Sequence, residues 1–271
     1  MFKCDYHTHT LFSFDGVNSP DELCEAAIAR GVTDLAITDH FECNLKADGA
    51  YEGYDADAAF NAIMSSKEKY RGKLNLTYGI ELGQPNQYPE EARRLLESHD
   101  FEFVIGSVHN LFNSPDFYYY DFTKIDNDGY ISLLFDKNIK ELCDAIDACD
   151  KIDAIAHLTY MHRYIAMAGK AHDFTKHFDK VSKLYEKMIS KGIALEVNVS
   201  TLWRGLGFAL PDRDFLSLYR ECGGKLITVG TDSHGVAHIG ECVVEGFSLL
   251  RFVGLNDVLV VRNGEKTIIK I

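Results

Sequence analysis

The sequence predicts an α/β fold: a barrel of seven β/α units followed by a C-terminal β-hairpin. Short apolar runs alternate with longer amphipathic segments along the 271 residues, and the runs are apolar on both faces, as in buried parallel strands. No linker rich in serine, proline or glycine divides the chain, which contains only five prolines. We therefore expect a single domain over residues 1–271.

The expected strands are the short apolar runs at residues 2–6, 34–38, 74–82, 101–108, 151–157, 193–199 and 225–230. Helical patterns separate them at residues 20–31, 57–70, 89–97, 129–149, 175–190, 212–222 and 238–250. Asn18-Ser19-Pro20 is a start signal for the first helix, and Gly31 is its stop signal. Strands that alternate with helices pair in parallel through right-handed crossovers.

Three connecting segments complete the expected architecture. Asn263-Gly264 lies between two strand-like runs and predicts a two-residue hairpin turn. Residues 110–128, which are rich in aromatic side chains, and residues 158–174 are expected to form two long loops. Long loops within a compact domain are usually functional.

The composition limits the classes of partner and the location. The formal net charge of -13 argues against a nucleic acid as the main partner, because phosphate backbones are bound by basic surfaces. An anionic substrate would then need bound cations. The seven cysteines are odd in number and widely spaced, which argues against a disulfide framework. With no signal peptide or apolar membrane-spanning run, a cytoplasmic location is expected, and the oligomeric state stays open.

Ligand-type side chains follow almost every expected strand. In chain order they are His7 and His9, Asp39 and His40, Glu81, His109, His157, Asn198, and Asp232 and His234, with Asp15 in the loop after His9. Active sites of α/β barrels lie at the C-terminal ends of the strands, so these side chains are expected to converge. Imidazole and carboxylate without thiolate suit zinc, iron, manganese or nickel.

Each of these residues also has a structural interpretation. A lone histidine near a strand end is usually a hydrogen-bonded structural residue, and Asp39 or Asp232 could cap a helix. Glu81 could be a buried acid paired with a cation, and Asp15 a turn residue before Gly16. Their joint position at one end of one barrel favours a metal cluster. The remaining histidines His99, His172, His177 and His238 are interpreted as solvated or capping residues.

Six motifs, in the order YHTHTLFSFDG, AITDH, GIELG, GSVH, IAHL and GTDSH, resemble the PHP (polymerase and histidinol phosphatase) superfamily. The chain length and EVNVSTLWR are similar to its histidinol-phosphate phosphatase branch. The resemblance implies a distorted seven-stranded (β/α)7 barrel that holds three divalent metal ions, with zinc, manganese or iron as candidates. The implied ligand sets are His7, His9, Glu81 and Asp232; Glu81, His109 and His157; and Asp15, His40 and His234.

The resemblance further implies a metal-dependent phosphomonoesterase in which a metal-bridging hydroxide attacks phosphorus, so no protein nucleophile is assigned. The expected substrate is L-histidinol phosphate, a small anionic phosphate ester of histidine biosynthesis. Arg163 and Arg204 are candidates for binding the phosphate, with surface ion pairs as the alternative. Protonation of the leaving group is unassigned; Asp39, His162 or a metal-bound water could serve. Trp203 and Tyr118–Tyr120 could close over it or merely pack.

Four other functions remain open. A PHP-type phosphodiesterase or nuclease is disfavoured by the acidic net charge. A phosphatase that acts on another small metabolite is not disfavoured by this charge. A metal-binding regulatory barrel without turnover is disfavoured by the complete set of ligands and the two arginines. A metal-dependent amidohydrolase is disfavoured because no lysine lies at a suitable strand end.

Overall fold

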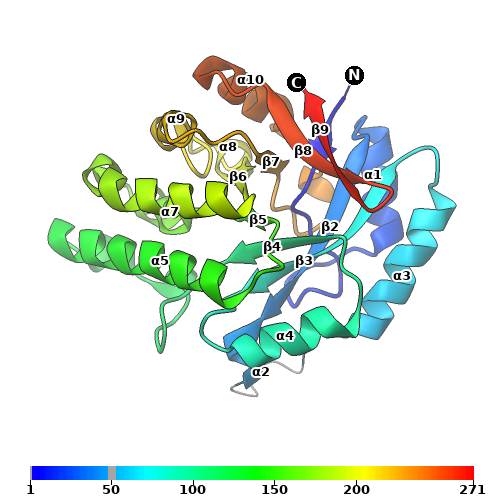
Figure 1. Ribbon diagram of the computed structural model, residues 1–271, viewed down its shortest axis with the longest axis horizontal. Helices are drawn as coiled ribbons and strands as arrows, with labels where there is room; N and C mark the ends of the chain where they lie inside the picture. The colour runs from blue at the N-terminus through cyan, green and yellow to red at the C-terminus, as the bar shows by residue number, and fades with distance from the viewer. Residues whose placement is uncertain (1, 48–52) are drawn as a thin grey trace.

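The protein forms a parallel sheet that curls into a nearly closed barrel (Figure 1). The computed structural model describes residues 2–47 and 53–271. Seven strands pair in sequence order: β1 (Cys4–Asp5), β2 (Asp34–Glu42), β3 (Asn75–Gly83), β4 (Phe103–Ser107), β5 (Ala154–Ile155), β6 (Ala194–Asn198) and β7 (Ile227–Gly230). The Tyr6 N–H donates to Val229 O at 2.9 Å and the Asp232 N–H to His7 O at 2.8 Å, which brings the last strand back to the first. The predicted seven-stranded barrel is confirmed.

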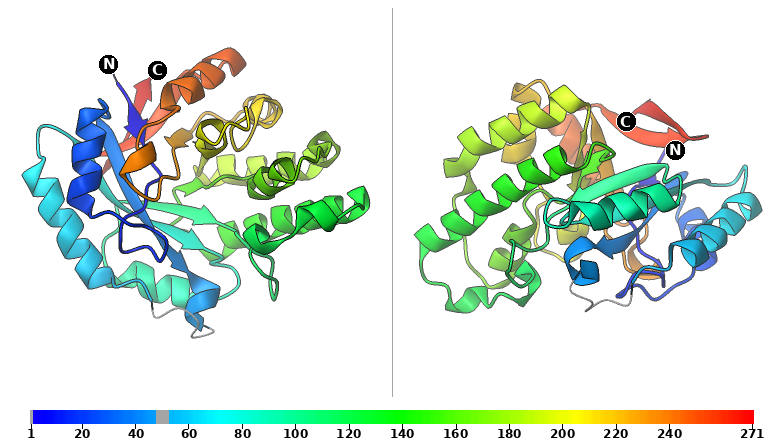
Figure 2. Two further views of the ribbon diagram at one scale, coloured as in Figure 1. Left: turned by 180° about the vertical axis from the view of Figure 1, so that it is seen from behind. Right: turned by 60° about the horizontal axis from the view of Figure 1, so that its bottom comes forward.

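Helices surround the outside of the sheet (Figures 1 and 2). They are α1 (Pro20–Ala29), α3 (Ala56–Lys69), α4 (Pro89–Ser98), α5 (Asp128–Ala148), α7 (Phe178–Lys191), α9 (Arg213–Glu221) and α10 (Val243–Val253). The shorter helices α2 (Cys43–Ala47), α6 (Tyr160–Met167) and α8 (Ser200–Trp203) follow the C-terminal ends of β2, β5 and β6. The predicted start signal works as a capping box, in which Ser19 and Glu22 each accept a backbone N–H of the other. None of the described helices has the length and apolar character needed to cross a membrane.

The two segments expected to be loops contain short helices. Residues 110–128 contain the 3₁₀ turns η1 (Phe117–Tyr119) and η2 (Phe122–Lys124), and residues 158–174 contain α6. Thr159 occupies the N-cap position of α6, but its side chain makes no capping hydrogen bond. Burial of Met161 and Ile165 in the core stabilises the helix instead.

The C-terminal hairpin, β8 (Asp257–Arg262) and β9 (Glu265–Lys270), lies across the N-terminal ends of the barrel strands. Asn263 and Gly264 both have positive φ, 53° and 76°, as the predicted two-residue turn requires. Arg262 donates two hydrogen bonds to Asp34, the first residue of β2, at 2.7 and 2.9 Å. The hairpin thus covers one end of the barrel and leaves the C-terminal ends of the strands for a site.

Tyr6 anchors this hairpin from inside the barrel. Its buried hydroxyl donates to Val261 O at 3.1 Å, accepts from the Val261 N–H at 2.5 Å, and lies 3.2 Å from Thr77 Oγ1. We expect Tyr6→Phe to lower the free energy of unfolding by about 1–3 kcal/mol, because buried Val261 groups lose their partner. Urea unfolding would measure this loss. Tyr130→Phe, on an exposed ring, is the matched control, and equal stability of the two variants would contradict the prediction.

Candidate metal centre

A cavity of about 1010 Å³ opens at the C-terminal ends of the strands. Loops after several strands contribute to its wall, among them residues 14–18 after β1, 109–119 after β4 and 234–238 after β7. The wall also includes the proposed ligands Asp15, His40, His109, His157, Asp232 and His234. This is the end of the barrel at which the sequence places the ligand-type residues.

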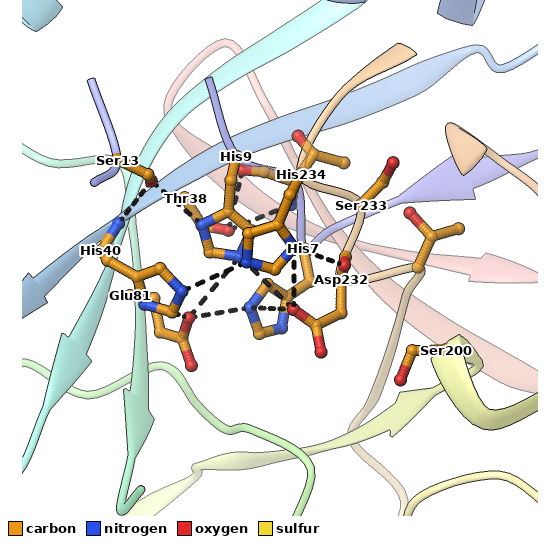
Figure 3. A network of polar contacts seen from close by, with 12 residues as sticks. His7, His9, Ser13, Thr38, His40, Glu81, Ser200, Asp232, Ser233 and His234 are labelled. Carbon is orange, nitrogen blue, oxygen red and sulfur yellow. Dashed lines mark hydrogen bonds and ion pairs between the residues drawn. The ribbon is translucent and has the colours of Figure 1, made fainter. Parts of the chain in front are cut away.

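Glu81, the seventh residue of β3, lies beside His7 and His40 in the cluster (Figure 3). Its Oε1 is 3.1 Å from His109 Nε2 and 3.0 Å from His157 Nε2. Its Oε2 is 3.0 Å from His7 Nε2 and 2.9 Å from His40 Nδ1. One fully buried carboxylate therefore contacts imidazoles from four different strand ends, as a ligand shared between metal ions would.

The second part of the cluster surrounds His9 (Figure 3). His9 Nε2 lies 3.5 Å from Asp232 Oδ1, and its ring stacks on the rings of His40 and His234 at centroid distances of 4.2 and 4.3 Å. His234 Nε2 lies 3.1 Å from Asp15 Oδ2, so Asp15 reaches the cluster although its side chain is 40% exposed. The structure thus brings all nine predicted ligands together.

Protein groups hold the outer nitrogens of several imidazoles, so that the inner nitrogens face the cluster. His7 Nδ1 lies 2.7 Å from Glu196 Oε1, and His109 Nδ1 lies 2.9 Å from Glu42 Oε1. His9 Nδ1 lies 3.2 Å from Ser13 Oγ. A carboxylate or hydroxyl partner on one nitrogen fixes the ring and leaves the other nitrogen as a metal ligand.

The imidazole nitrogens that face the cluster are arranged to bind cations rather than to form hydrogen bonds with one another. His109 Nε2 lies 3.3 Å from His157 Nε2, and His40 Nε2 lies 3.4 Å from His234 Nε2. His9 Nε2 is buried and has no hydrogen-bond partner among the described residues. Burial, together with the neighbouring His40 and His234, lowers the pKa of His9 from 6.5 to about 3, so its ring is neutral. A buried neutral imidazole with an unused lone pair is a ligand that divalent transition ions accept. Around His7, His40 and His109 the neighbouring carboxylates outweigh burial and raise the pKa, so a metal ion bound there would displace protons.

The buried carboxylates stay ionised. Burial alone would raise the pKa of Glu81, but the surrounding His40, His7 and His109 lower it well below its usual value. The pKa of Asp232 is also lowered, since His7 and Arg163 outweigh its burial. His157 and Asp232 have positive φ angles of 22° and 55°, an uncommon conformation for residues other than glycine that is often found at functional sites.

Sequence reasoning missed two acidic residues of this centre, Glu42 and Glu196. Glu42 forms a potential metal group with His40 and His109, and Glu196 accepts both from His7 and from the His157 N–H at 2.7 Å. Glu42 follows His40 by two residues on β2, so the alternation of side chains along a strand was the available signal. Gly230 leaves room for this arrangement, because a β-carbon there would lie 2.6 Å from Glu196 Oε1.

The two candidate proton donors lie away from the cavity wall. Asp39 accepts hydrogen bonds from the Thr10 N–H at 2.6 Å and hydroxyl at 2.8 Å, and from the Ser13 hydroxyl at 2.9 Å. His162 stacks on Phe208 at a centroid distance of 4.2 Å. Neither belongs to the described residues that line the cavity. Asp39 instead fixes the loop that carries His9.

Both predicted arginines line the cavity, but they differ in surroundings. Arg163 on α6 is 6% exposed, and its Nη2 donates to Asp232 Oδ2 at 2.8 Å and to Ser200 Oγ at 2.6 Å. Arg204 lies over the ring of Trp203 at 4.3 Å. Arg163 therefore orients a proposed ligand as well as facing the cavity.

The interpretation of His238 as a solvated or capping residue is wrong. It is not merely solvated: its ring stacks on Trp203 at a centroid distance of 3.9 Å and lines the cavity. His177 is buried beside Asp136, with Nδ1 2.7 Å from Oδ1. Side-chain packing between distant segments decides both positions.

Glu196→Gln tests whether the outer carboxylates position the ligands. The amide keeps the shape of the side chain but removes the charge that holds His7 Nδ1. We expect metal affinity to fall about 10- to 100-fold. Titration of metal-free protein with zinc would measure the loss. Glu186→Gln on α7 is the matched control, and unchanged affinity in Glu196→Gln would contradict the prediction.

Comparisons with known proteins agree with this geometry. A family model described as the PHP domain matches residues 5–200. Histidinol-phosphatase of Lactococcus lactis subsp. lactis (strain IL1403) is 28% identical over 266 residues, covering 95% of this chain and 94% of that protein. Histidinol-phosphatase of Bacillus subtilis (strain 168) is 22% identical over 262 residues, covering 89% of this chain and 96% of that protein.

Among solved structures, this chain resembles histidinol phosphate phosphatase from Lactococcus lactis, crystallised with zinc, L-histidinol and phosphate. The TM-score is 0.82 at 22% identity, and the match covers 98% of this chain and 100% of the other. At this identity the likeness establishes a shared fold. The family model, which matches most of the chain, establishes that this protein belongs to the PHP domain family.

Proposed function

We propose that this protein is a metal-dependent phosphomonoesterase that hydrolyses L-histidinol phosphate to L-histidinol and phosphate, a step of histidine biosynthesis. The observation that carries the proposal is the convergence of imidazoles and carboxylates on Glu81 at the base of a cavity that also contains Arg163. The identity of the substrate is inferred from the relatives that are named histidinol-phosphatase. We expect such an enzyme to act in the cytoplasm.

In this proposal the nine side chains hold three divalent ions, with zinc, manganese or iron as candidates. His7, His9, Glu81 and Asp232 would hold one ion, and Glu81, His109 and His157 a second. Asp15, His40 and His234 would hold the third. Glu42 Oε1 lies 3.3 Å from His40 Nδ1 and 2.9 Å from His109 Nδ1. Glu42 would therefore either orient these two ligands or bind a metal ion together with them. The close approach of these groups supports the assignment.

Divalent ions held there would supply Lewis acidity and an activated water near neutral pH. The protein's own residues hold and orient the phosphate. Arg163 faces the cavity with an Nε that is buried and has no hydrogen-bond partner among the described residues, so it can donate to a phosphate oxygen. Arg204 would add a second positive charge. With the ions bound, the acidic chain presents a positive site to a dianion.

Phosphate release from L-histidinol phosphate tests the proposal. Purified protein is expected to release phosphate when manganese or zinc is supplied, and thorough chelation is expected to abolish release until metal is returned. Chelated protein should keep its folded circular dichroism spectrum, which separates loss of metal from unfolding. Undiminished activity after complete metal removal would rule the proposal out.

A PHP-type phosphodiesterase or nuclease is the second candidate, because PHP proteins share this barrel. The net charge of -13 and the two arginines that line the cavity favour a small monoester. Comparing L-histidinol phosphate with cyclic diesters and short single-stranded DNA would distinguish them. We expect monoester hydrolysis to be faster by orders of magnitude.

A further inference from the structure

Asn198, the last residue of β6, is a polar strand-end residue to which the proposed metal centre gives no role. Its side chain is fully buried, and it is not among the described residues that line the cavity. It therefore lies behind the cavity wall. Burying a carboxamide costs free energy unless its hydrogen bonds are made, so the partners of Asn198 indicate what it does.

The two ends of the Asn198 carboxamide contact different groups. Its Nδ2 donates to Glu196 Oε2 at 3.3 Å. Its Oδ1 accepts from the Ser200 N–H at 3.1 Å and also from the Ser200 hydroxyl. The backbone of Asn198 pairs with Leu210 through two hydrogen bonds of 2.9 Å. Because one end donates to a carboxylate and the other accepts from an N–H, only one of the two amide orientations satisfies both partners.

Glu196 connects this amide to the metal centre. Its Oε1 lies 2.7 Å from His7 Nδ1, and its Oε2 accepts from the His157 N–H at 2.7 Å as well as from Asn198. Both oxygens of this buried carboxylate are thus engaged. Rotation of the carboxylate would release the ring of His7, so Asn198 restrains a proposed ligand through Glu196.

Ser200 connects the other end of the amide to Arg163. A serine hydroxyl has one hydrogen, and here it is donated to Asn198 Oδ1. The lone pairs of Ser200 Oγ are therefore left to accept from Arg163 Nη2, at 2.6 Å. The same Nη2 donates to Asp232 Oδ2 at 2.8 Å. Asn198 thus sets the direction of the hydroxyl, and the hydroxyl holds a guanidinium that lines the cavity.

From this chain of contacts we propose that Asn198 and Ser200 are positioning residues that hold Arg163 in a fixed place relative to the metal centre. The proposal rests on the proposed phosphatase function and deepens it, because phosphate affinity then depends on two residues behind the cavity wall. Asn198 acts on both Glu196 and Ser200, whereas Ser200 acts on Arg163. The two residues therefore have different expected effects on the binding of zinc and of phosphate.

Binding of zinc and of inorganic phosphate separates these effects without any turnover. Metal-free, full-length protein is titrated with zinc, and zinc-loaded protein is titrated with inorganic phosphate in a calorimeter. We expect Ser200→Ala to weaken phosphate binding about tenfold, because Arg163 loses an acceptor, and to keep zinc affinity within about twofold. We expect Asn198→Ala to weaken the binding of zinc and of phosphate, each about tenfold.

Thr201→Val is the matched control for the loss of a buried hydroxyl. Thr201 is also fully buried on α8, and its hydroxyl donates to Phe208 O, outside this chain of contacts. Urea unfolding of the metal-free proteins should show similar losses of stability in Ser200→Ala and Thr201→Val, whereas only Ser200→Ala should bind phosphate more weakly. Equal phosphate affinities in the two variants would make Ser200 a purely structural residue and overturn the proposal.

The double variant Asn198→Ala/Ser200→Ala tests whether the two residues act in series. Because Asn198 orients Ser200, the double variant is expected to bind phosphate about as weakly as Asn198→Ala alone. Fully additive losses, or unchanged zinc affinity in Asn198→Ala, would contradict the proposal. If zinc-loaded wild-type protein binds no inorganic phosphate, the proposed phosphatase function fails. The zinc affinity of Asn198→Ala then still decides whether the amide positions the metal centre.

Discussion

Glu81→Gln is expected to reduce kcat/KM for phosphate release by about 10³-fold or more. Glu81 contacts four imidazoles through its two oxygens, and a neutral amide would place an N–H group against some of them. An amide nitrogen has no lone pair for a metal ion. The variant should therefore lose both bound metal and activity.

Elemental analysis and activity of the same preparation would check this prediction. Glu97→Gln on the exposed face of α4 is the control and is expected to retain metal and turnover. A Glu81→Gln protein with a full metal content and nearly wild-type activity would show that Glu81 is not shared between ions. Circular dichroism would establish that both variants are folded.

Arg163→Met is expected to lower kcat/KM by about 10²- to 10³-fold, for two reasons. It removes a guanidinium from the cavity, and it leaves the buried Asp232 without the donor that lies 2.8 Å from its Oδ2. Breaking a buried ion pair by removing one partner costs about 3–5 kcal/mol, so metal-free protein should also be less stable. Methionine retains much of the apolar side-chain volume.

Arg204→Met separates these two effects. Arg204 packs on Trp203 and, within the part of the chain that the structure describes, forms no ion pair with a proposed ligand. We therefore expect a smaller loss of about tenfold and little change in stability. Steady-state kinetics and urea unfolding of metal-free protein would compare the two variants. Equal effects would mean that the contact between Arg163 and Asp232 contributes nothing to catalysis.

The sequence was sufficient to predict the seven β/α units, because buried parallel strands are apolar on both faces and the intervening helices are amphipathic. It was also sufficient for the hairpin turn at Asn263-Gly264, which only residues tolerant of positive φ can form. The convergence of the ligand-type residues followed from one rule, that all loops at the C-terminal ends of barrel strands lie at the same end of the barrel. The choice of nine ligands among them came from the resemblance to the PHP superfamily.

The alternation of side chains along β2 indicates which of its polar residues face the cluster. Side chains alternate along a strand, so Asp39 and His40 must point in opposite directions, whereas His40 and Glu42 point the same way. The structure has Glu42 beside His109 and Asp39 on Thr10 and Ser13. The sequence predicts that this strand ends at residue 38, whereas β2 extends to Glu42. The shared direction of His40 and Glu42 is therefore not evident from the predicted strand.

Taken alone, the sequence determined which strand ends carry imidazoles and carboxylates, because that follows from the order of apolar and polar residues. Only the tertiary structure decided how those groups meet: Glu196 on His7, Trp203 on His238, and Arg163 on Asp232. These pairs join segments far apart in the chain. Their geometry depends on the closure of the barrel and the packing of α6, which neither spacing nor composition encodes.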